Sequence, residues 1–288
     1  MSTKSKLLLL GVVLFDIFLW FFVFSIFFNK NGIYYYQFDV GQGDASLLSL
    51  PGEVEIVYDF GPSGKIVEQI EKTLSPSNRR LEIAIISHPQ YDHYAGLLSV
   101  LQKFDIGVLI TSGRLPQENE ITWKEILHLL TQKQIPHLVV EKGDKIFYQS
   151  STLQVLWPDS HWVKSGEPND ASLVVRADLG RGSILLTGDI GGEAEKALVN
   201  NYASSLQSNI LKIPHHGSKY STSVELLKAV KPQFAVVSSG YNNRYGHPHP
   251  ELLRRVNDRQ IPLWRIDQKG GLKIQLVEGQ IKANPFPG

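Results

Sequence analysis

The chain has 288 residues, 42% of them hydrophobic and 20% charged, a composition typical of a globular protein with a sizeable core. Its formal net charge of +1 gives no global attraction to a polyanion, so nucleic-acid binding would need a local basic patch. The absence of cysteine excludes disulfides and thiolate metal sites, which leaves His, Asp, Glu and neutral oxygen donors for any metal.

The first element in chain order is an apolar run from Leu7 to Phe28, in which Asp16 is the one charged residue. As a helix, its 22 residues span about 33 Å, close to the hydrocarbon core of a bilayer at about 30 Å. A cleaved signal peptide is the alternative, but the run is long for one and no small-x-small cleavage site follows it. Lys4 and Lys6 precede the run and only Lys30 follows closely. This favours a single-pass anchor with the remaining chain on the extracytoplasmic side.

After a short hinge at Asn29 to Gly32, no second linker or short repeat appears, which predicts one domain over residues 33–288. Runs rich in β-branched and aromatic residues predict strands at Tyr34–Phe38, Ala45–Leu50, Glu55–Asp59 and Ile83–Ser87. Amphipathic segments predict helices at Gly64–Leu74, Ala95–Phe104, Ile121–Gln134 and Glu193–Tyr202. Ser172–Leu179 and Ser183–Thr187, joined by a Gly-Arg-Gly turn, predict a hairpin. We therefore expect an α/β (α+β) fold with mixed sheets flanked by helices.

Metal-capable side chains follow several of these strands. The apolar strand at Ile83 leads into Ser-His-Pro-Gln-Tyr-Asp-His, residues 87–93. Other strands end in Asp59-Phe60-Gly61, in Thr187-Gly188-Asp189 and in Pro214-His215-His216-Gly217-Ser218, and Gly246-His247-Pro248-His249 follows a strand at Phe234. A surface loop rich in His and Asp would explain the first motif alone. Six of the nine histidines lie in these motifs, however, which indicates a shared metal site.

Together with Asp39-Val40-Gly41-Gln42-Gly43-Asp44-Ala45 and Asn169-Asp170-Ala171-Ser172, these motifs resemble the metallo-β-lactamase superfamily. The resemblance is specifically to the hydrolase domain of ComEC-type DNA-uptake (competence) proteins, whose motif order it follows over nearly all of residues 33–288. It implies a four-layer αββα sandwich with a site for one or two metal ions, Zn²⁺ or Mn²⁺, at the edge between two sheets.

The resemblance also implies roles for individual residues. The metal ligands would be His88, Gln90, Asp92, His93, Asp189 and His215. Three further residues would contact the metal ligands and orient them, namely Asp44, Asp59 and Asn169. Asp92 would also orient the attacking water, and His247 would act as the acid. Substrate contacts would come from Ser218, Arg244 and His249, and further phosphate contacts from lysines near the motifs, such as Lys212.

The chain departs from the family pattern at Gln90, where the usual loop has a histidine. An amide oxygen is a weaker zinc ligand than imidazole, and Asn169 and Asp170 stand where many members have another histidine. The first metal position therefore has few nitrogen donors, whereas the second keeps four ligands.

These features leave three hypotheses open. The favoured one is a membrane-anchored metal-dependent phosphodiesterase or nuclease that acts on DNA outside the membrane. The others are a degenerate binding protein accessory to DNA uptake, and a hydrolase of a small ester, lipid or nucleotide. Full-length ComEC-type proteins carry many membrane helices, so an uptake role would require a separate channel protein.

Overall fold

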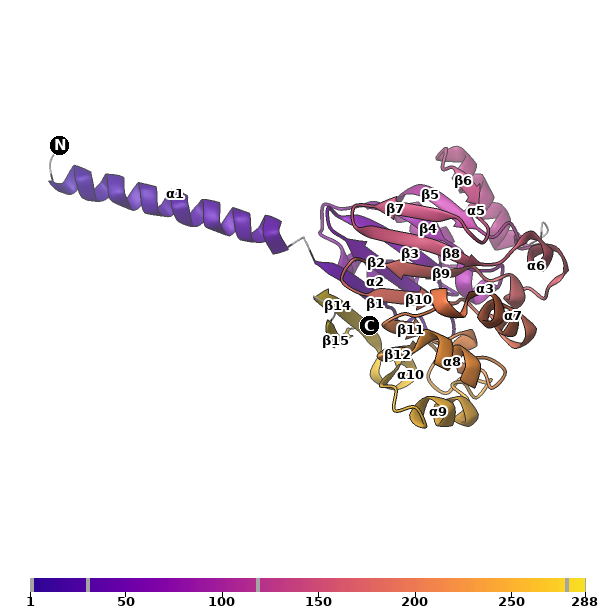
Figure 1. Ribbon diagram of the computed structural model, residues 1–288. Coiled ribbons are helices and arrows are strands. Elements are labelled where there is room, and N and C mark those ends of the chain that lie inside the picture. Colours follow the sequence, from indigo (N-terminus) through magenta and orange to yellow (C-terminus); the bar gives the residue numbers. More distant parts are fainter. Residues whose placement is uncertain (1–2, 30–31, 118–119, 278–279, 288) are drawn as a thin grey trace.

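The computed structural model of the protein describes residues 3–29, 32–117, 120–277 and 280–287 (Figure 1). Helix α1 (Thr3–Asn29) projects away from the rest of the chain, and its apolar window Thr3–Phe22 has a mean hydropathy of 2.1 with none of it buried. Among the described residues it is the one helix long and apolar enough to cross a membrane. Two residues of the predicted hinge, Lys30 and Asn31, lie outside the described residues.

The remaining chain forms two mixed sheets. The first sheet has the order β15-β14-β1-β2-β3-β4-β5-β6. Its strands are β1 (Ile33–Gln37), β2 (Ala45–Leu50), β3 (Val54–Phe60), β4 (Arg80–Ile85), β5 (Asp105–Thr111), β6 (His137–Val139), β14 (Gly271–Val277) and β15 (Gln280–Phe286). The second sheet has the order β13-β12-β11-β10-β9-β8-β7. Its strands are β7 (Lys145–Tyr148), β8 (Ser151–Trp157), β9 (Val174–Asp178), β10 (Ser183–Leu186), β11 (Ile210–Lys212), β12 (Phe234–Val237) and β13 (Leu263–Arg265).

Three apolar clusters separate four layers. Successive side chains of a strand point to opposite faces, so that Leu48 packs between the sheets and Leu47 packs on the outer face of the first sheet. In the second sheet Leu186 packs between the sheets and Leu185 packs on the outer face. This alternation buries both faces of both sheets, and it confirms the predicted sandwich.

Helices cover the two outer faces. The first sheet packs against α2 (Lys65–Thr73), α4 (Leu97–Lys103) and α5 (Ile121–Gln132), and the second against α7 (Gly192–Tyr202), α8 (Val224–Val230) and α9 (Pro250–Asn257). Shorter helices lie in the connections, namely α3 (Tyr91–Tyr94), α6 (Ser160–Ser165), η1 (Asn169–Ala171), η2 (Ala203–Ser205), η3 (His215–Gly217) and α10 (Ile266–Lys269). The predicted strands, helices and hairpin are confirmed, with shifts of a few residues at their ends.

Parallel pairing determines where the motifs meet. Strands β3, β4, β5 and β6 pair in parallel, and so do β10, β11, β12 and β13. The carboxyl ends of parallel strands meet at one edge of a sheet, where ligands of α/β sheets commonly bind. The predicted motifs follow these ends, so both sheets present their polar loops at the same edge of the sandwich.

Candidate metal centre

At this edge Asp59, at the end of β3, is fully buried among hydrogen-bond donors. Its carboxylate accepts from the backbone N–H of Ser87 at 2.7 Å and from the Ser87 hydroxyl at 2.8 Å, and it lies 2.9 Å from Nδ1 of His93. Burial raises the pKa of Asp59, and His93 opposes that rise. A carboxylate on Nδ1 fixes the orientation of the imidazole and leaves Nε2 free to bind a metal.

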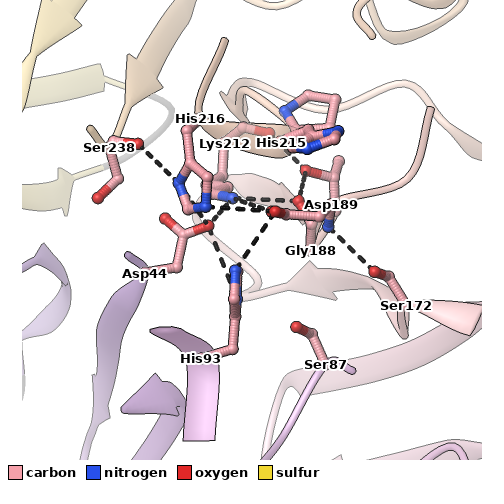
Figure 2. Close-up of polar contacts among 12 residues, drawn as sticks. Asp44, Ser87, His93, Ser172, Gly188, Asp189, Lys212, His215, His216 and Ser238 are labelled. Carbon is pink, nitrogen blue, oxygen red and sulfur yellow. Dashed lines mark hydrogen bonds and ion pairs between the residues drawn. The ribbon is translucent and has the colours of Figure 1, made fainter. Parts of the chain in front are cut away.

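The free Nε2 of His93 points to a group of side chains from both sheets (Figure 2). It lies 3.4 Å from Oδ2 of Asp189, which lies 3.2 Å from Nε2 of His216. The same Nε2 of His216 is 3.4 Å from Oδ2 of Asp92. In a tetrahedral zinc site with metal–ligand distances of about 2.0–2.2 Å, neighbouring ligand atoms lie about 3.3–3.6 Å apart. These three contacts therefore have about the spacing of neighbouring ligands in one such site.

His216 replaces the predicted His215 in this group. Its Nδ1 lies 3.0 Å from the backbone oxygen of Ser238, which leaves Nε2 toward Asp189. His215 instead places its Nε2 3.3 Å from the side-chain nitrogen of Asn169. Both rings line the same cleft, with 6.4 Å between their centres, but only His216 belongs to the group whose ligand atoms lie within 4.8 Å of one another. His216 therefore takes the place in this group that was predicted for His215.

The histidines and carboxylates of this group shift one another's pKa values. Burial lowers the pKa of both His93 and His216, but the nearby Asp189 carboxylate raises both by more. The pKa of His93 is therefore well above its ordinary value, and that of His216 is about 10. Burial likewise opposes ionisation of Asp92, yet the His216 ring, whose Nε2 lies 3.4 Å from its carboxylate, lowers the pKa of Asp92 to about 2. These directions favour protonated rings of His93 and His216 beside the Asp189 carboxylate when no metal is bound.

Asp44 and Lys212 form a buried ion pair behind Asp189. The Lys212 ammonium donates to the Asp44 carboxylate and, at 3.1 Å, to the oxygen of Gly188, and it lies 3.8 Å from Oδ1 of Asp189. Lys212 is only 2% exposed, so the prediction that it meets a phosphate is wrong. Asp44 was expected to orient a ligand histidine, but its nearest charged partner is this ammonium.

Among the described residues, Asp44, His93, Asp189 and His216 form the one buried His and acidic cluster whose ligand atoms all lie within 4.8 Å of one another. Because Lys212 already holds the Asp44 carboxylate, Asp92 is the better fourth ligand. Nε2 of His93, Nε2 of His216 and Oδ1 of Asp189 have no hydrogen-bond partner although they are buried. Unpaired buried polar atoms are costly, and a divalent ion would satisfy them. The residues therefore fit a metal ion.

The neighbouring first position is less complete. His88 is buried and its Nε2 has no hydrogen-bond partner, while its Nδ1 lies 2.9 Å from the Ser87 hydroxyl. Burial, together with His93, lowers the pKa of His88 to about 3, so its ring is neutral and can bind a metal. Beside it, the side chain of Gln90 donates to that of Asn169, which also contacts His215. The amides at this position thus interact with each other, and a single histidine remains as a strong donor.

Gly43 allows the two halves of the centre to approach closely. It adopts a φ of 146°, and a Cβ there would lie 2.5 Å from the backbone oxygen of Asp92. The next residue, Asp44, donates its backbone N–H to this same oxygen at 3.2 Å. A side chain at position 43 would therefore push the Asp44 loop away from the helix that carries Asp92 and His93.

The centre opens into a cleft of about 740 Å³, within the range of small-molecule sites. The lining includes Gln42, Gln90, Tyr91, Asp92, Asn169, Asp189, His215, His216, Asn243, Arg244, Tyr245 and His247. Two predicted substrate residues lie outside this lining. Ser218 is buried in the turn after η3, where its hydroxyl accepts from the backbone of Tyr220, and His249 caps α9. Arg244 is exposed at the cleft, as a substrate contact requires.

His247 stands beside the metal ligands in the cleft. Its ring lies 6.5 Å from that of His216 and 6.0 Å from that of His215. Burial and these two neighbours lower the pKa of His247 to about 4, so its ring is neutral at pH 7.

Sequence reasoning missed two residues of this centre. His216 was placed in the right motif but next to the assigned ligand. Lys212 was treated as exposed, although alternation along β11 places it on the same side as Ile210, which packs between the sheets. That pattern was a usable signal for a buried lysine.

Comparison with known proteins agrees with this geometry. The family model described as the metallo-beta-lactamase superfamily matches residues 38–241. The chain belongs to this superfamily. Its four layers are the superfamily's αββα sandwich, and the candidate centre lies at the edge between the two sheets.

Within the superfamily the chain is similar to competence proteins of the ComEC type. It is 26% identical to ComE operon protein 3 of Bacillus subtilis over 255 residues, which is 82% of this chain and 32% of the relative. It is 31% identical to competence protein ComA of Neisseria gonorrhoeae over 246 residues, which is 85% of this chain and 32% of the relative. The chain thus spans about a third of the length of these relatives.

A solved structure shares the fold. The metallo-beta-lactamase fold protein YhfI of Bacillus subtilis matches with a TM-score of 0.55 at 12% identity, covering 85% of this chain and 99% of that one.

Proposed function

We propose that the protein is a membrane-anchored metal-dependent phosphodiesterase that acts as a nuclease on DNA outside the membrane. The observation that supports this most strongly is the group formed by Asp92, His93, Asp189 and His216, in which the contacts His93–Asp189, Asp189–His216 and His216–Asp92 are 3.2–3.4 Å, as between ligands of one divalent ion, beside an open cleft. Zn²⁺ and Mn²⁺ both suit a set of two imidazoles and two carboxylates.

A divalent ion supplies Lewis acidity and lowers the pKa of a bound water from about 15.7 toward 7. The surrounding residues can orient the water, donate a proton and bind phosphate. Asp92, which is partly exposed, faces the cleft and can orient the attacking water. His247 can hydrogen-bond the leaving oxygen, and the negative charge of a phosphate beside it would raise its low pKa toward the value needed to donate a proton. Arg244 can bind a flanking phosphate.

DNA is the proposed polymer because the similar proteins are named for competence. The anchor would be α1, and the lysines before it favour the extracytoplasmic side for the domain. A role in DNA uptake would involve a separate channel protein as partner.

A second candidate is a binding protein without catalytic activity. It is favoured by Gln90 and Asn169, whose amides interact where family members usually place metal-binding histidines. The polymer-binding cleft would then be retained while hydrolysis is lost.

Activity and metal content together separate these two candidates. The full-length protein, purified in detergent, is loaded with Zn²⁺ or Mn²⁺ and assayed on single-stranded DNA, duplex DNA and bis-p-nitrophenyl phosphate, with bound metal measured by elemental analysis. We expect about one ion per chain and DNA cleavage that is abolished in Asp189→Asn. Bound metal without cleavage of any substrate would favour the binding protein, and cleavage of the small diester alone would exclude DNA as the substrate.

A further inference from the structure

The cleft beside the metal centre carries aromatic side chains that the hydrolytic chemistry does not use. Tyr91 and Tyr245 both line it, and they remain 52% and 53% exposed. Tyr91 begins α3, whereas Tyr245 belongs to the loop that follows β12, so two separate segments contribute them. Exposed tyrosines at the mouth of a polar cleft indicate a ligand with flat apolar faces as well as charge.

Parallel rings lead from the metal centre to Tyr245. The ring of His247 lies 6.5 Å from that of His216, with 28° between their planes. The ring of Tyr245 lies 5.8 Å from that of His247, with 24° between their planes. The guanidinium of Arg244 lies 4.8 Å from the centre of the Tyr245 ring. His216, His247, Tyr245 and Arg244 therefore follow one another along one wall of the cleft, from the metal centre outward.

The loop that carries this wall is held by its own side chains. The Asn243 side-chain oxygen accepts from the backbone N–H groups of Tyr245 and His247 at 3.2 and 3.0 Å. Its side-chain nitrogen donates to the backbone oxygen of Gly240 at 2.9 Å, and the Gly240 N–H donates to the Gln42 side chain at 3.1 Å. Because these bonds exist before any ligand binds, stacking on Tyr245 costs little ordering of the loop.

We infer that Tyr245 is a stacking platform for an unpaired nucleobase, so that the substrate is a single-stranded nucleic acid whose neighbouring phosphodiester lies at the metal centre. This inference rests on the proposed phosphodiesterase function and names the form of its substrate. Proteins bind single strands by stacking bases on aromatic rings, each base contributing about 5- to 150-fold in affinity, and by placing cations on the backbone.

Duplex DNA fits the platform poorly, because both faces of an internal base are covered by its neighbours in the stack. The exposed guanidinium of Arg244 lies over the Tyr245 ring and donates to its hydroxyl at 2.7 Å. A base that stacks on this face would displace the guanidinium, which could then bind the neighbouring phosphate. Tyr91, beside Asp92, offers a second ring close to the reacting bond.

The test compares two single strands that carry the same charge. Full-length Asp189→Asn protein, in which cleavage is disabled, is titrated with a fluorescent eight-nucleotide thymidine strand and with an abasic strand of equal length. We expect the strand with bases to bind at least about tenfold more tightly. Adding Tyr245→Leu should reduce this ratio to about twofold and leave the affinity for the abasic strand unchanged, whereas Tyr245→Phe should preserve the ratio.

Phe147→Leu is the matched control, because Phe147 is an exposed aromatic residue of β7 outside the lining of the cleft. It should preserve the ratio. Equal binding of the two strands, an unchanged ratio in Tyr245→Leu, or duplex binding as tight as single-strand binding would overturn the inference. Competition by thymidine monophosphate as strong as that by the oligonucleotide would also overturn it, because the ligand would then be a nucleotide. Base-dependent binding through Tyr245 by a wild-type protein that cleaves no DNA would support the platform while refuting the proposed nuclease.

Discussion

Nε2 of His216 lies 3.2 Å from Oδ2 of Asp189, and both side chains are buried. Two such atoms at this distance have the spacing of neighbouring ligands of one metal ion. We therefore predict that His216→Asn lowers metal affinity at least about 100-fold, whereas His215→Asn changes it less than about fivefold. Both histidines have φ near 50°, which asparagine tolerates, so the two variants form a matched pair. Metal retained after dialysis checks this, and loss of metal in the His215 variant alone would restore the original assignment.

Asp59 acts on the metal through His93, so it is a positioning residue. We predict that Asp59→Asn lowers metal affinity about 10- to 100-fold, because an amide no longer supplies the carboxylate that orients the ring. Asparagine suits the φ of 62° at this position, and the fold should persist. Glu55→Gln, another buried acid of β3, is the control and should leave metal affinity unchanged. Equal affinity in the Asp59 variant and the wild type would remove Asp59 from the site.

Metal binding should depend on pH, because the metal displaces protons from His93 and His216. Both pKa values are raised in the metal-free protein, so we predict that metal affinity rises about 10- to 100-fold per pH unit near pH 7. Calorimetry in buffers of different ionisation enthalpy would count the released protons. A metal affinity independent of pH would show that His93 and His216 are not protonated in the metal-free protein.

The same shift predicts the stability of the metal-free protein. The pKa of His216 is about 10 when folded and about 6.5 when unfolded, so its contribution to stability is fully present below pH 6.5 and is lost as the pH rises toward 10. The melting temperature of EDTA-treated protein should therefore fall between pH 7 and pH 10. A melting temperature that increases over this range would show that His216 is neutral without metal.

The first metal position can be strengthened by a single substitution. We predict that Gln90→His raises metal stoichiometry from about one toward two ions per chain, because His88 has an unpaired Nε2 next to it and imidazole binds zinc better than an amide. Gln42→His, in the same cleft, is the control and should leave the stoichiometry at one. Elemental analysis after gel filtration measures both, and an unchanged value for Gln90→His would mean that position 90 does not face His88.

Patterns along the chain predicted the strands and the edge at which they meet, because alternation and strand-end motifs are local properties. These sequence patterns could not show which of His215 and His216 is the metal ligand. The two rings are distinguished by contacts with residues distant in the sequence, Ser238 for His216 and Asn169 for His215, which the local motif does not contain. The pairing of Asp44 with Lys212 joins residues 168 positions apart in the sequence, and it depends on the contact between the two sheets.

The direction of β1 separates the candidate metal centre from the end of the domain that α1 joins. β1 runs antiparallel to β2, which runs antiparallel to β3, so β1 points the same way as β3. The chain leaves α1 and begins β1 at Ile33, while the metal ligands follow the opposite ends of the parallel strands. At about 3.3 Å per residue, the five residues of β1 alone place the centre about 16 Å farther from the anchor. The proposed polymer substrate would therefore be bound at the end of the strands opposite to the end at which the chain enters β1 from α1.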